Sequence, residues 1–116
     1  MYDFTAPRHA VGRALLMGDA ATVARPHTGA GVVKALQDAT ILETALTSTA
    51  TWSEGLAAYD ADRAPSGRVM VDLGRRLGRA LVTQTPNWQT LDQRSFQTWW
   101  KQATGTEGFG GRQLTR

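Results

Sequence analysis

The chain contains no cysteine, which excludes disulfide bonds and thiolate chemistry. Histidine is also scarce: His9 and His27 are the only two, and they lie too far apart in sequence to form a local metal-binding motif, so we expect no metal site. No stretch approaches the roughly 20 apolar residues that a membrane span requires, and the first residues lack an apolar run of signal-peptide length. We therefore expect a cytoplasmic protein without a membrane partner.

An excess of one charge is also lacking. Thirteen basic and ten acidic residues give a formal net charge of +3, and the basic residues cluster only at Arg75, Arg76 and Arg79, with Asp72 beside them. Nucleic-acid-binding domains usually gather many basic residues on one face, whereas a solvated helix surface with internal ion pairs has the sparser pattern seen here. Nucleic acid is therefore not an expected partner.

The length and composition predict a small domain with a thin core. A chain of 116 residues forms about one such domain and buries only roughly two-thirds of its unfolded surface. Hydrophobic residues make up 41% of the chain and 12 residues are glycine, so we expect surface that requires a covering partner. We expect residues 1–104 to form an incomplete domain and the glycine-rich residues 105–116 to form a flexible tail.

A short apolar run, Ala14 to Met17, lies between Gly12 and Gly18. This pattern predicts a strand over about residues 13–17 that is buried on both faces. So short a strand needs a neighbour, and the segment from Tyr2 to Thr5, which we interpret as an edge strand or extended arm, is the candidate for that neighbour.

Helical periodicity dominates the rest of the chain, so the expected fold class is mainly α with a short β element. A first helix over about residues 30–48 carries an apolar stripe, which places Lys34 and Asp38 on its polar side. The stripe consists of Val32, Ala35, Leu36, Ala39, Leu42 and Leu46.

Two further helices are predicted. The second, over about residues 52–82, begins at a capping box formed by Thr51 and Glu54. Its apolar positions keep the same phase on both sides of Pro65, which favours one long helix kinked there over two separate helices. The third helix covers about residues 88–103. Gly105 follows it as a natural C-terminal stop.

The most informative segment runs from Gly12 to Leu46 and reads GRALLMGDAATVARPHTGAGVVKALQDATILETAL. It resembles the flavin-binding C-terminal motif of the para-hydroxybenzoate hydroxylase family of FAD-dependent aromatic-ring monooxygenases. In that family a strand ends in Gly-Asp-Ala, a loop with a proline and Thr-Gly follows, and a helix begins under the isoalloxazine ring. The run from Ala24 to Thr28 is similar to the 2,6-dihydroxypyridine 3-hydroxylase branch. The resemblance implies the C-terminal fragment of an α/β, Rossmann-like FAD-binding fold.

Asp19 is the main candidate for a contact with the cofactor. It follows Gly18 just past the carboxyl end of the expected strand, where a carboxylate can accept hydrogen bonds from ligand hydroxyls. The resemblance implies that these hydroxyls belong to the ribityl chain of FAD. Outside such a motif, an aspartate at this place would be read as a cap of a helix or turn.

The start of the first helix is the second candidate. Its first amides lack internal acceptors and favour negative charge. The resemblance implies that the backbone of Val32 and Val33 faces the N1 and O2 edge of the flavin, which becomes negative on reduction. Without the resemblance, the segment is an ordinary glycine-rich helix start. The cofactor-binding residues implied by the resemblance are Gly18, Asp19, Pro26, Gly29, Gly31, Val32 and Val33, and no catalytic residue is assigned.

Other residues near this segment have simpler interpretations. The resemblance places the Pro26 carbonyl near the reactive carbon of the flavin ring, and we interpret His27 as a residue that fills the loop. For Arg25 and Arg63 we expect structural ion pairs, with Asp38 or Asp60 as partner, in preference to a role in clamping substrate. At helical spacing, tryptophans are more often core or interface anchors than stacking platforms for bases, and this applies to Trp52, Trp88, Trp99 and Trp100.

Complete members of the family also carry an amino-terminal βαβ unit with GxGxxG for the FAD pyrophosphate, a middle motif for FAD and NAD(P)H, and a substrate sheet. None of these is recognisable in the sequence, so we expect a truncated product, one half of a split gene or an artificially shortened chain, inactive alone. Its expected partner is the missing FAD-binding half or a second copy. The resemblance implies that the full enzyme hydroxylates a small aromatic or N-heterocyclic substrate with NAD(P)H and O₂. The alternative is a stand-alone helical module that binds proteins, or weakly binds nucleic acid, without a cofactor.

Overall fold

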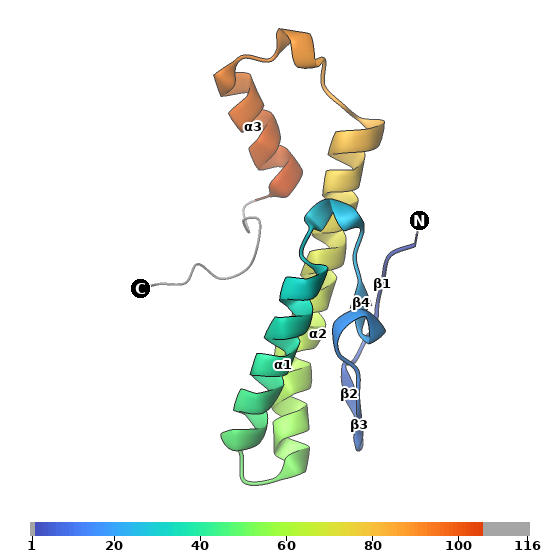
Figure 1. The fold of residues 1–116 in the computed structure, drawn as a ribbon, viewed down its shortest axis with the longest axis vertical. Coiled ribbons are helices and arrows are strands. Elements are labelled where there is room, and N and C mark those ends of the chain that lie inside the picture. Colours follow the sequence, from blue (N-terminus) through green and yellow to red (C-terminus); the bar gives the residue numbers. More distant parts are fainter. Residues whose placement is uncertain (1, 106–116) are drawn as a thin grey trace.

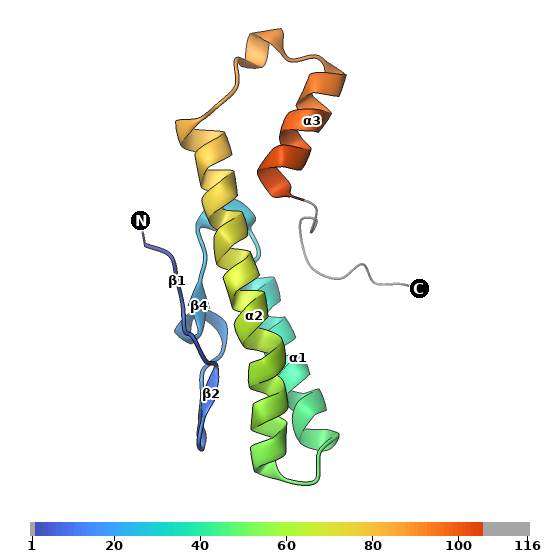
Figure 2. The ribbon, with the colours of Figure 1, turned by 180° about the vertical axis from the view of Figure 1, so that it is seen from behind.

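The computed structural model describes residues 2–105 and is mainly helical, as predicted. Two long helices, α1 (Gly31–Thr47) and α2 (Trp52–Gly78), lie antiparallel and side by side (Figures 1 and 2). The short strands of the amino-terminal segment lie along one side of α2. The third helix, α3 (Gln93–Thr104), folds back near the carboxyl-terminal end of α2.

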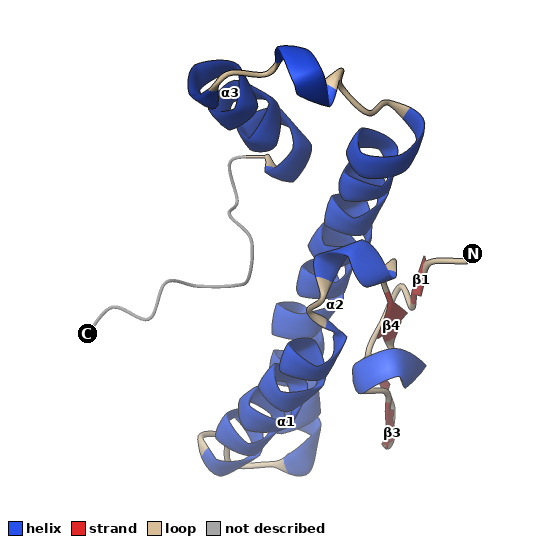
Figure 3. Ribbon diagram, turned by 45° about the horizontal axis from the view of Figure 1, so that its top comes forward, coloured by secondary structure: helices blue, strands red, loops and turns tan. Residues whose placement is uncertain are grey.

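Two antiparallel pairs of very short strands make up the β structure (Figure 3). The strand β1 (Phe4–Thr5) pairs with β4 (Thr22–Val23), and β2 (Ala10–Val11) pairs with β3 (Ala14–Leu15). The Tyr2–Thr5 segment therefore does supply a strand, but its partner is β4.

The prediction of a buried strand over residues 13–17 is wrong. Only Ala14–Leu15 is a strand, and Ala14 and Leu16 are exposed. Gly12 has a φ of +59°, a left-handed conformation that glycine adopts without strain, and it turns the chain back on itself. The apolar run is thus the second arm of a tight hairpin and not a strand inside a sheet.

Side chains of α2 hold this hairpin in place. The Asp60 carboxylate accepts hydrogen bonds from the backbone N–H of His9 (2.5 Å) and of Ala10 (3.0 Å). The Tyr59 hydroxyl donates to the carbonyl of Leu16 at 2.9 Å, and burial raises the pKa of Tyr59 to about 12. Backbone groups that a wider sheet would pair are therefore satisfied by the helix.

Helix α1 has the predicted bounds within a residue, but the prediction of its buried face is only partly right: Ala35, Leu42 and Leu46 of the predicted stripe are half-buried, and Leu42 packs against the core. Lys34 and Asp38, expected on the polar side, are buried together with Ala45. Val32 and Leu36, expected in the core, are 76% and 65% exposed. Lys34 and Asp38 can be buried because they form an ion pair.

Helix α2 begins at the predicted capping box: Thr51 Oγ1 accepts the Glu54 N–H at 3.2 Å, and Glu54 accepts the Thr51 N–H at 3.0 Å. The helix crosses Pro65 without a break, which confirms one long element; the kink there stays a prediction. A π-helical turn over Arg79–Thr83 extends it to the predicted end.

Helix α3 begins at Gln93 and not near residue 88 as predicted. Trp88–Thr90 form a separate 3₁₀ turn, and Asp92 caps the helix by accepting the Ser95 N–H at 2.7 Å. Gly105, with a φ of +75°, ends it as expected. From residue 106 onward the predicted flexible tail lies outside the described residues.

The small size of Gly67 allows α2 to approach the amino-terminal segment. A Cβ at this position would lie 2.4 Å from Thr22 Oγ1 and 2.7 Å from Thr5 Oγ1. We expect Gly67→Ala to lower the free energy of unfolding by about 1–3 kcal/mol through overpacking, as measured by urea denaturation. Gly31→Ala is the matched control, because no atom lies within 4 Å of its added Cβ. An equal effect of the two substitutions would contradict the close contact at Gly67.

Candidate functional site

The Gly18–Ala20 segment forms a 3₁₀ turn that is fixed at its first residue. Gly18 is buried with a φ of +58°, and its N–H donates to Asp38 Oδ2 of α1 at 2.8 Å. A Cβ on Gly18 would lie 3.4 Å from the Cβ of Ala35, so the turn packs directly on α1. Asp19, the next residue, is exposed.

The loop that follows β4 contains a second 3₁₀ turn, Pro26–Thr28, which ends at Gly29 with a φ of +59°. Thr28 is buried; its hydroxyl donates to the Arg25 carbonyl at 3.2 Å and accepts the Ala30 N–H at 3.3 Å. Pro26 and Gly29 are exposed. The loop is thus braced from inside, and its outer surface is accessible.

Close contacts with α2 support the same loop. A Cβ at Gly74 would lie 3.1 Å from the backbone nitrogen of Arg25, and a Cβ at Gly78 would lie 2.9 Å from Arg25 Nη1 and 3.2 Å from His27 Cδ2. Glycine at these two positions therefore lets the loop lie against the helix.

The amino-terminal end of α1 is open. The first backbone hydrogen bond of the helix runs from the Lys34 N–H to the Ala30 carbonyl at 2.8 Å, so the amides of residues 31–33 precede the helical hydrogen-bonding ladder. Val32 and Val33 are 76% and 49% exposed, and no atom lies within 4 Å of a Cβ built on Gly31. The residues that carry these amides are therefore at the surface of the described part of the chain.

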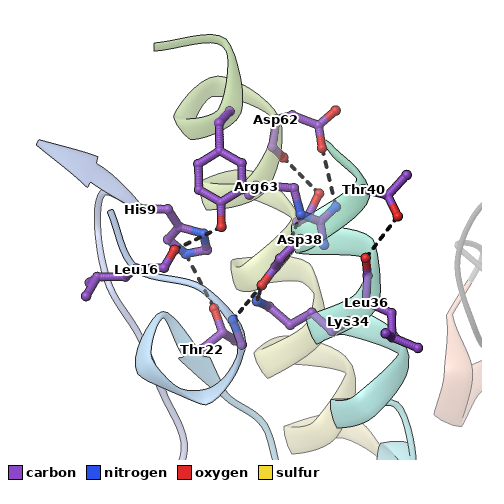
Figure 4. A network of polar contacts seen from close by, with 12 residues as sticks. His9, Leu16, Thr22, Lys34, Leu36, Asp38, Thr40, Asp62 and Arg63 are labelled. Carbon is purple, nitrogen blue, oxygen red and sulfur yellow. Dashed lines mark hydrogen bonds and ion pairs between the residues drawn. The ribbon is translucent and has the colours of Figure 1, made fainter. Parts of the chain in front are cut away.

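Three buried charged side chains, Lys34 and Asp38 of α1 and Arg63 of α2, form an ion cluster (Figure 4). Asp38 Oδ2 accepts Lys34 Nζ at 2.5 Å, and Asp38 Oδ1 accepts Arg63 Nε at 2.7 Å. Burial raises the pKa of Asp38, but hydrogen bonds from Lys34, Gly18 and Arg63 outweigh it and hold the pKa below its ordinary value. The predicted ion pair of Arg63 is confirmed with Asp38. The Lys34 contact was missed, although its i, i+4 spacing from Asp38 is a signal for it.

Arg25 also forms an ion pair, but neither of the predicted partners is involved. Arg25 Nε lies 2.8 Å from Asp3 Oδ2, and Arg75 Nη2 lies 2.6 Å from Asp3 Oδ1. Hydrogen bonds from Arg75 and Arg25 hold the pKa of Asp3 below its ordinary value. Asp3 thus ties the amino-terminal arm to the loop and to α2.

His9 is buried beside the cluster, with Nε2 at 3.4 Å from Thr22 Oγ1 and Nδ1 without a hydrogen-bond partner in the described part of the chain. Burial, reinforced by Lys34 and Arg63, lowers the pKa of His9, while Asp38 and Asp60 act in the opposite direction. The folded protein therefore holds His9 neutral more strongly than the unfolded chain does.

The sign of the pH dependence follows from this shift. Above the unfolded pKa of about 6.5, His9 is neutral in both states and adds no slope. As the pH falls below that value, the unfolded chain takes up a proton first, and the free energy of unfolding falls by at most about 1.4 kcal/mol per pH unit. Urea unfolding at pH 7.5 and at pH 5.5 measures this fall in the free energy of unfolding. The control His27→Asn should show the same fall as wild type, and His9→Asn should show a smaller one. A fall in His9→Asn equal to that of wild type would contradict the role of His9.

The family model described as "FAD binding domain" matches residues 1–74, which contain the turn, the loop, α1 and most of α2. The chain belongs to the FAD-binding domain family. FAD is its cofactor.

A kynurenine 3-monooxygenase from Salinispora arenicola (strain CNS-205) is 39% identical over 69 residues. The match covers 60% of this chain and 15% of the relative, so the chain corresponds to a small part of that protein. No solved structure matches. Within the described residues, no helix is long and apolar enough to cross a membrane, and no group of three or more side chains has the composition of a metal site.

The residues that are present fit a flavin. Asp19 is exposed, and its carboxylate receives no hydrogen bond from the described residues. The residue before it, Gly18, donates its N–H to Asp38 of α1, and the first amides of this helix lie outside the helical hydrogen-bonding ladder. The structure thus packs the Gly18–Ala20 turn on α1 at Ala35 and Asp38, and Pro26 and Gly29 lie on the loop that leads into the start of this helix. Whether each contacts FAD stays a prediction.

Proposed function

We propose that the chain is the flavin-contacting segment of an FAD-dependent monooxygenase. The observation that carries this proposal is the placement of Asp19: Gly18 is tied to α1 through Asp38 and packs against Ala35, so the exposed Asp19 is held against the helix whose first amides lie outside its hydrogen-bonding ladder. Membership of the FAD-binding domain family and the similarity to a monooxygenase support the reaction class.

In this proposal each part of the surface has one task. The Asp19 carboxylate accepts hydrogen bonds from the ribityl hydroxyls, and the amides of residues 31–33 favour negative charge at the pyrimidine edge of the ring. The loop from Pro26 to Gly29 lies along the ring with its backbone. When bound, FAD would supply the oxygen chemistry: with two electrons from NAD(P)H, one oxygen atom of O₂ would enter the substrate and the other would leave as water.

We propose an electron-rich aromatic or N-heterocyclic ring as the substrate class, as the resemblance of residues 24–28 to the 2,6-dihydroxypyridine hydroxylase branch suggests. The remainder of the site, including the pyrophosphate-binding βαβ unit, is proposed to come from an amino-terminal FAD-binding half. We propose a cytoplasmic location for the assembled enzyme.

The isolated chain is expected to lose FAD during purification, because the pyrophosphate and adenine contacts that supply much of the affinity come from other sequence. Co-expression with the amino-terminal part of the Salinispora relative, up to the start of the matched segment, should give a reconstituted protein with a flavin absorbance spectrum. That amino-terminal part expressed alone is the control.

The possible outcomes separate the alternatives. Stoichiometric flavin on the isolated chain would contradict the division of the site between two parts. The proposed function would be contradicted if the chain is a compact monomer by sedimentation and acquires no flavin, either alone or when co-expressed with the amino-terminal part of the relative. That result would favour a stand-alone interaction module.

A further inference from the structure

We propose that Asp38 is a positioning residue for the cofactor: it holds the Gly18–Ala20 turn in the conformation that presents Asp19 to the ribityl chain. This inference rests on the proposed function and deepens it. No motif in the sequence assigns Asp38 a role, and the residue lies beneath the candidate surface, where it cannot touch the ligand itself.

Asp38 joins three separate elements. Its two carboxylate oxygens accept from the Gly18 N–H of the turn, from Lys34 Nζ of α1 and from Arg63 Nε of α2, at 2.8, 2.5 and 2.7 Å (Figure 4). The side chain of Asp38 is fully buried, and those of Lys34 and Arg63 are 3% and 8% exposed. Water cannot readily replace any of these donors, so the arrangement is effectively a single bonded unit.

The two cations fix the orientation of the carboxylate. Arg63 occupies Oδ1, and Lys34 shares Oδ2 with the Gly18 amide. Rotation of the carboxylate about its terminal bond would break hydrogen bonds to both cations. The oxygen that faces Gly18 therefore has a defined position relative to α1 and α2.

The position of Asp19 depends on this fixed point. No hydrogen bond from residues 2–105 reaches the Asp19 carboxylate, so the backbone of the turn alone sets its place. Gly18 is the residue immediately before it and has a left-handed φ of +58°. Release of the Gly18 amide would let the turn relax and move Asp19 relative to α1.

Asp60 offers a matched control. It is also a carboxylate that accepts backbone amides, those of His9 and Ala10, but these belong to the β2–β3 hairpin and not to the turn. Asp38→Asn and Asp60→Asn thus each remove one carboxylate that holds backbone N–H groups. Asparagine retains the volume of aspartate, but its single carbonyl oxygen cannot serve all three donors of Asp38.

The first test follows amide hydrogen exchange in the chain itself and does not depend on FAD. Asp38→Asn should speed exchange of the Gly18 amide about ten- to a hundred-fold more than exchange of the Leu56 amide in α2. Asp60→Asn removes a carboxylate charge outside the turn and should leave Gly18 near the wild-type exchange rate. Equal acceleration of Gly18 and Leu56 in Asp38→Asn would show a general loss of stability and overturn the inference.

The second test measures FAD affinity in the reconstituted protein at equal folded fraction. Asp38→Asn should weaken binding about tenfold, and Asp60→Asn by less than about threefold. If wild type binds FAD and Asp38→Asn binds it equally well, only this inference is overturned. If wild type does not bind FAD at all, the proposed function fails and the inference fails with it.

If Asp38→Asn does not fold, the double variant Lys34→Met/Asp38→Leu keeps the test decisive. It removes one cation and one anion together, a change that buried ion pairs often tolerate, and it still deprives the Gly18 amide of its acceptor. Fast Gly18 exchange and weak FAD binding in this variant would support the positioning role. Wild-type values for both would overturn it.

Discussion

Replacing Asp38 by alanine should lower the free energy of unfolding by about 3–5 kcal/mol, because Lys34 and Arg63 would remain buried without their shared counter-charge. This is a large part of the stability of a small domain, which is typically about 5–15 kcal/mol. The isolated chain should therefore show a much lower urea midpoint, or partial unfolding before urea is added, when followed by far-ultraviolet circular dichroism.

The charge-balanced variant separates charge from packing. Lys34→Met/Asp38→Leu removes the i, i+4 pair and leaves Arg63 with Asp62, which lies 3.3 Å from Arg63 Nη1. We expect this double variant to lose less than half of the stability that Asp38→Ala loses. If it is as unstable as Asp38→Ala, the buried charge that loses Asp38 is not the cause of the loss.

Replacing Asp19 by alanine should weaken FAD binding in the reconstituted protein about ten- to a hundred-fold, which corresponds to roughly 1.5–3 kcal/mol. The substitution removes a charged acceptor and leaves ribityl hydroxyls without a partner. Fluorescence titration of FAD into the apoprotein measures the effect.

The control for Asp19→Ala must be another exposed residue near the same helix. Lys34, which the sequence places on a polar face, is unsuitable because it is buried in the ion cluster. Glu43→Ala is suitable, since Glu43 is an exposed carboxylate further along α1, and it should leave the affinity within about twofold of wild type. Equal affinity of wild type and Asp19→Ala, at equal folded fraction, would show that the carboxylate does not hold the ribityl chain.

The helices could be predicted because their signals are local. Examples are the capping box at Thr51 and the glycine stop at Gly105, which act within a few residues, and the phase of apolar positions across Pro65, which lies within one helix. The three predicted helices all exist. The start of α3 was misplaced because aromatic spacing extends back to Trp88, whereas the cap at Asp92 decides where the helix begins.

The strand and the buried face of α1 could not be predicted for the opposite reason. Burial of a short apolar run depends on what packs beside it, and within the run from Ala14 to Met17 only Ala14–Leu15 pair with the hairpin arm before it. Polar residues are normally assigned to a solvated face, but Lys34 and Asp38 form an ion pair, and Asp38 also pairs with Arg63, which lies 25 positions further along the chain.

The sequence shows the order of the candidate site residues along the chain but not how they are arranged in space. The order Gly18, Asp19, loop, helix start is visible in the sequence, and the family match includes it. Arg63 was correctly expected to need a carboxylate, because an arginine on a buried stripe rarely lacks one. The bond from Asp38 to the Gly18 amide has no sequence signal, since either partner alone is unremarkable.

The most direct test of the central claim maps the contact between this chain and FAD. The chain is labelled with ¹⁵N, combined with the unlabelled part of the Salinispora relative that precedes the matched segment, and its amide resonances are compared before and after FAD is added. We predict the largest shifts at Asp19, Val32 and Val33, with small shifts in α3. Largest shifts in α3, with Asp19 and the start of α1 unaffected, would contradict the claim that this turn and helix end contact the flavin.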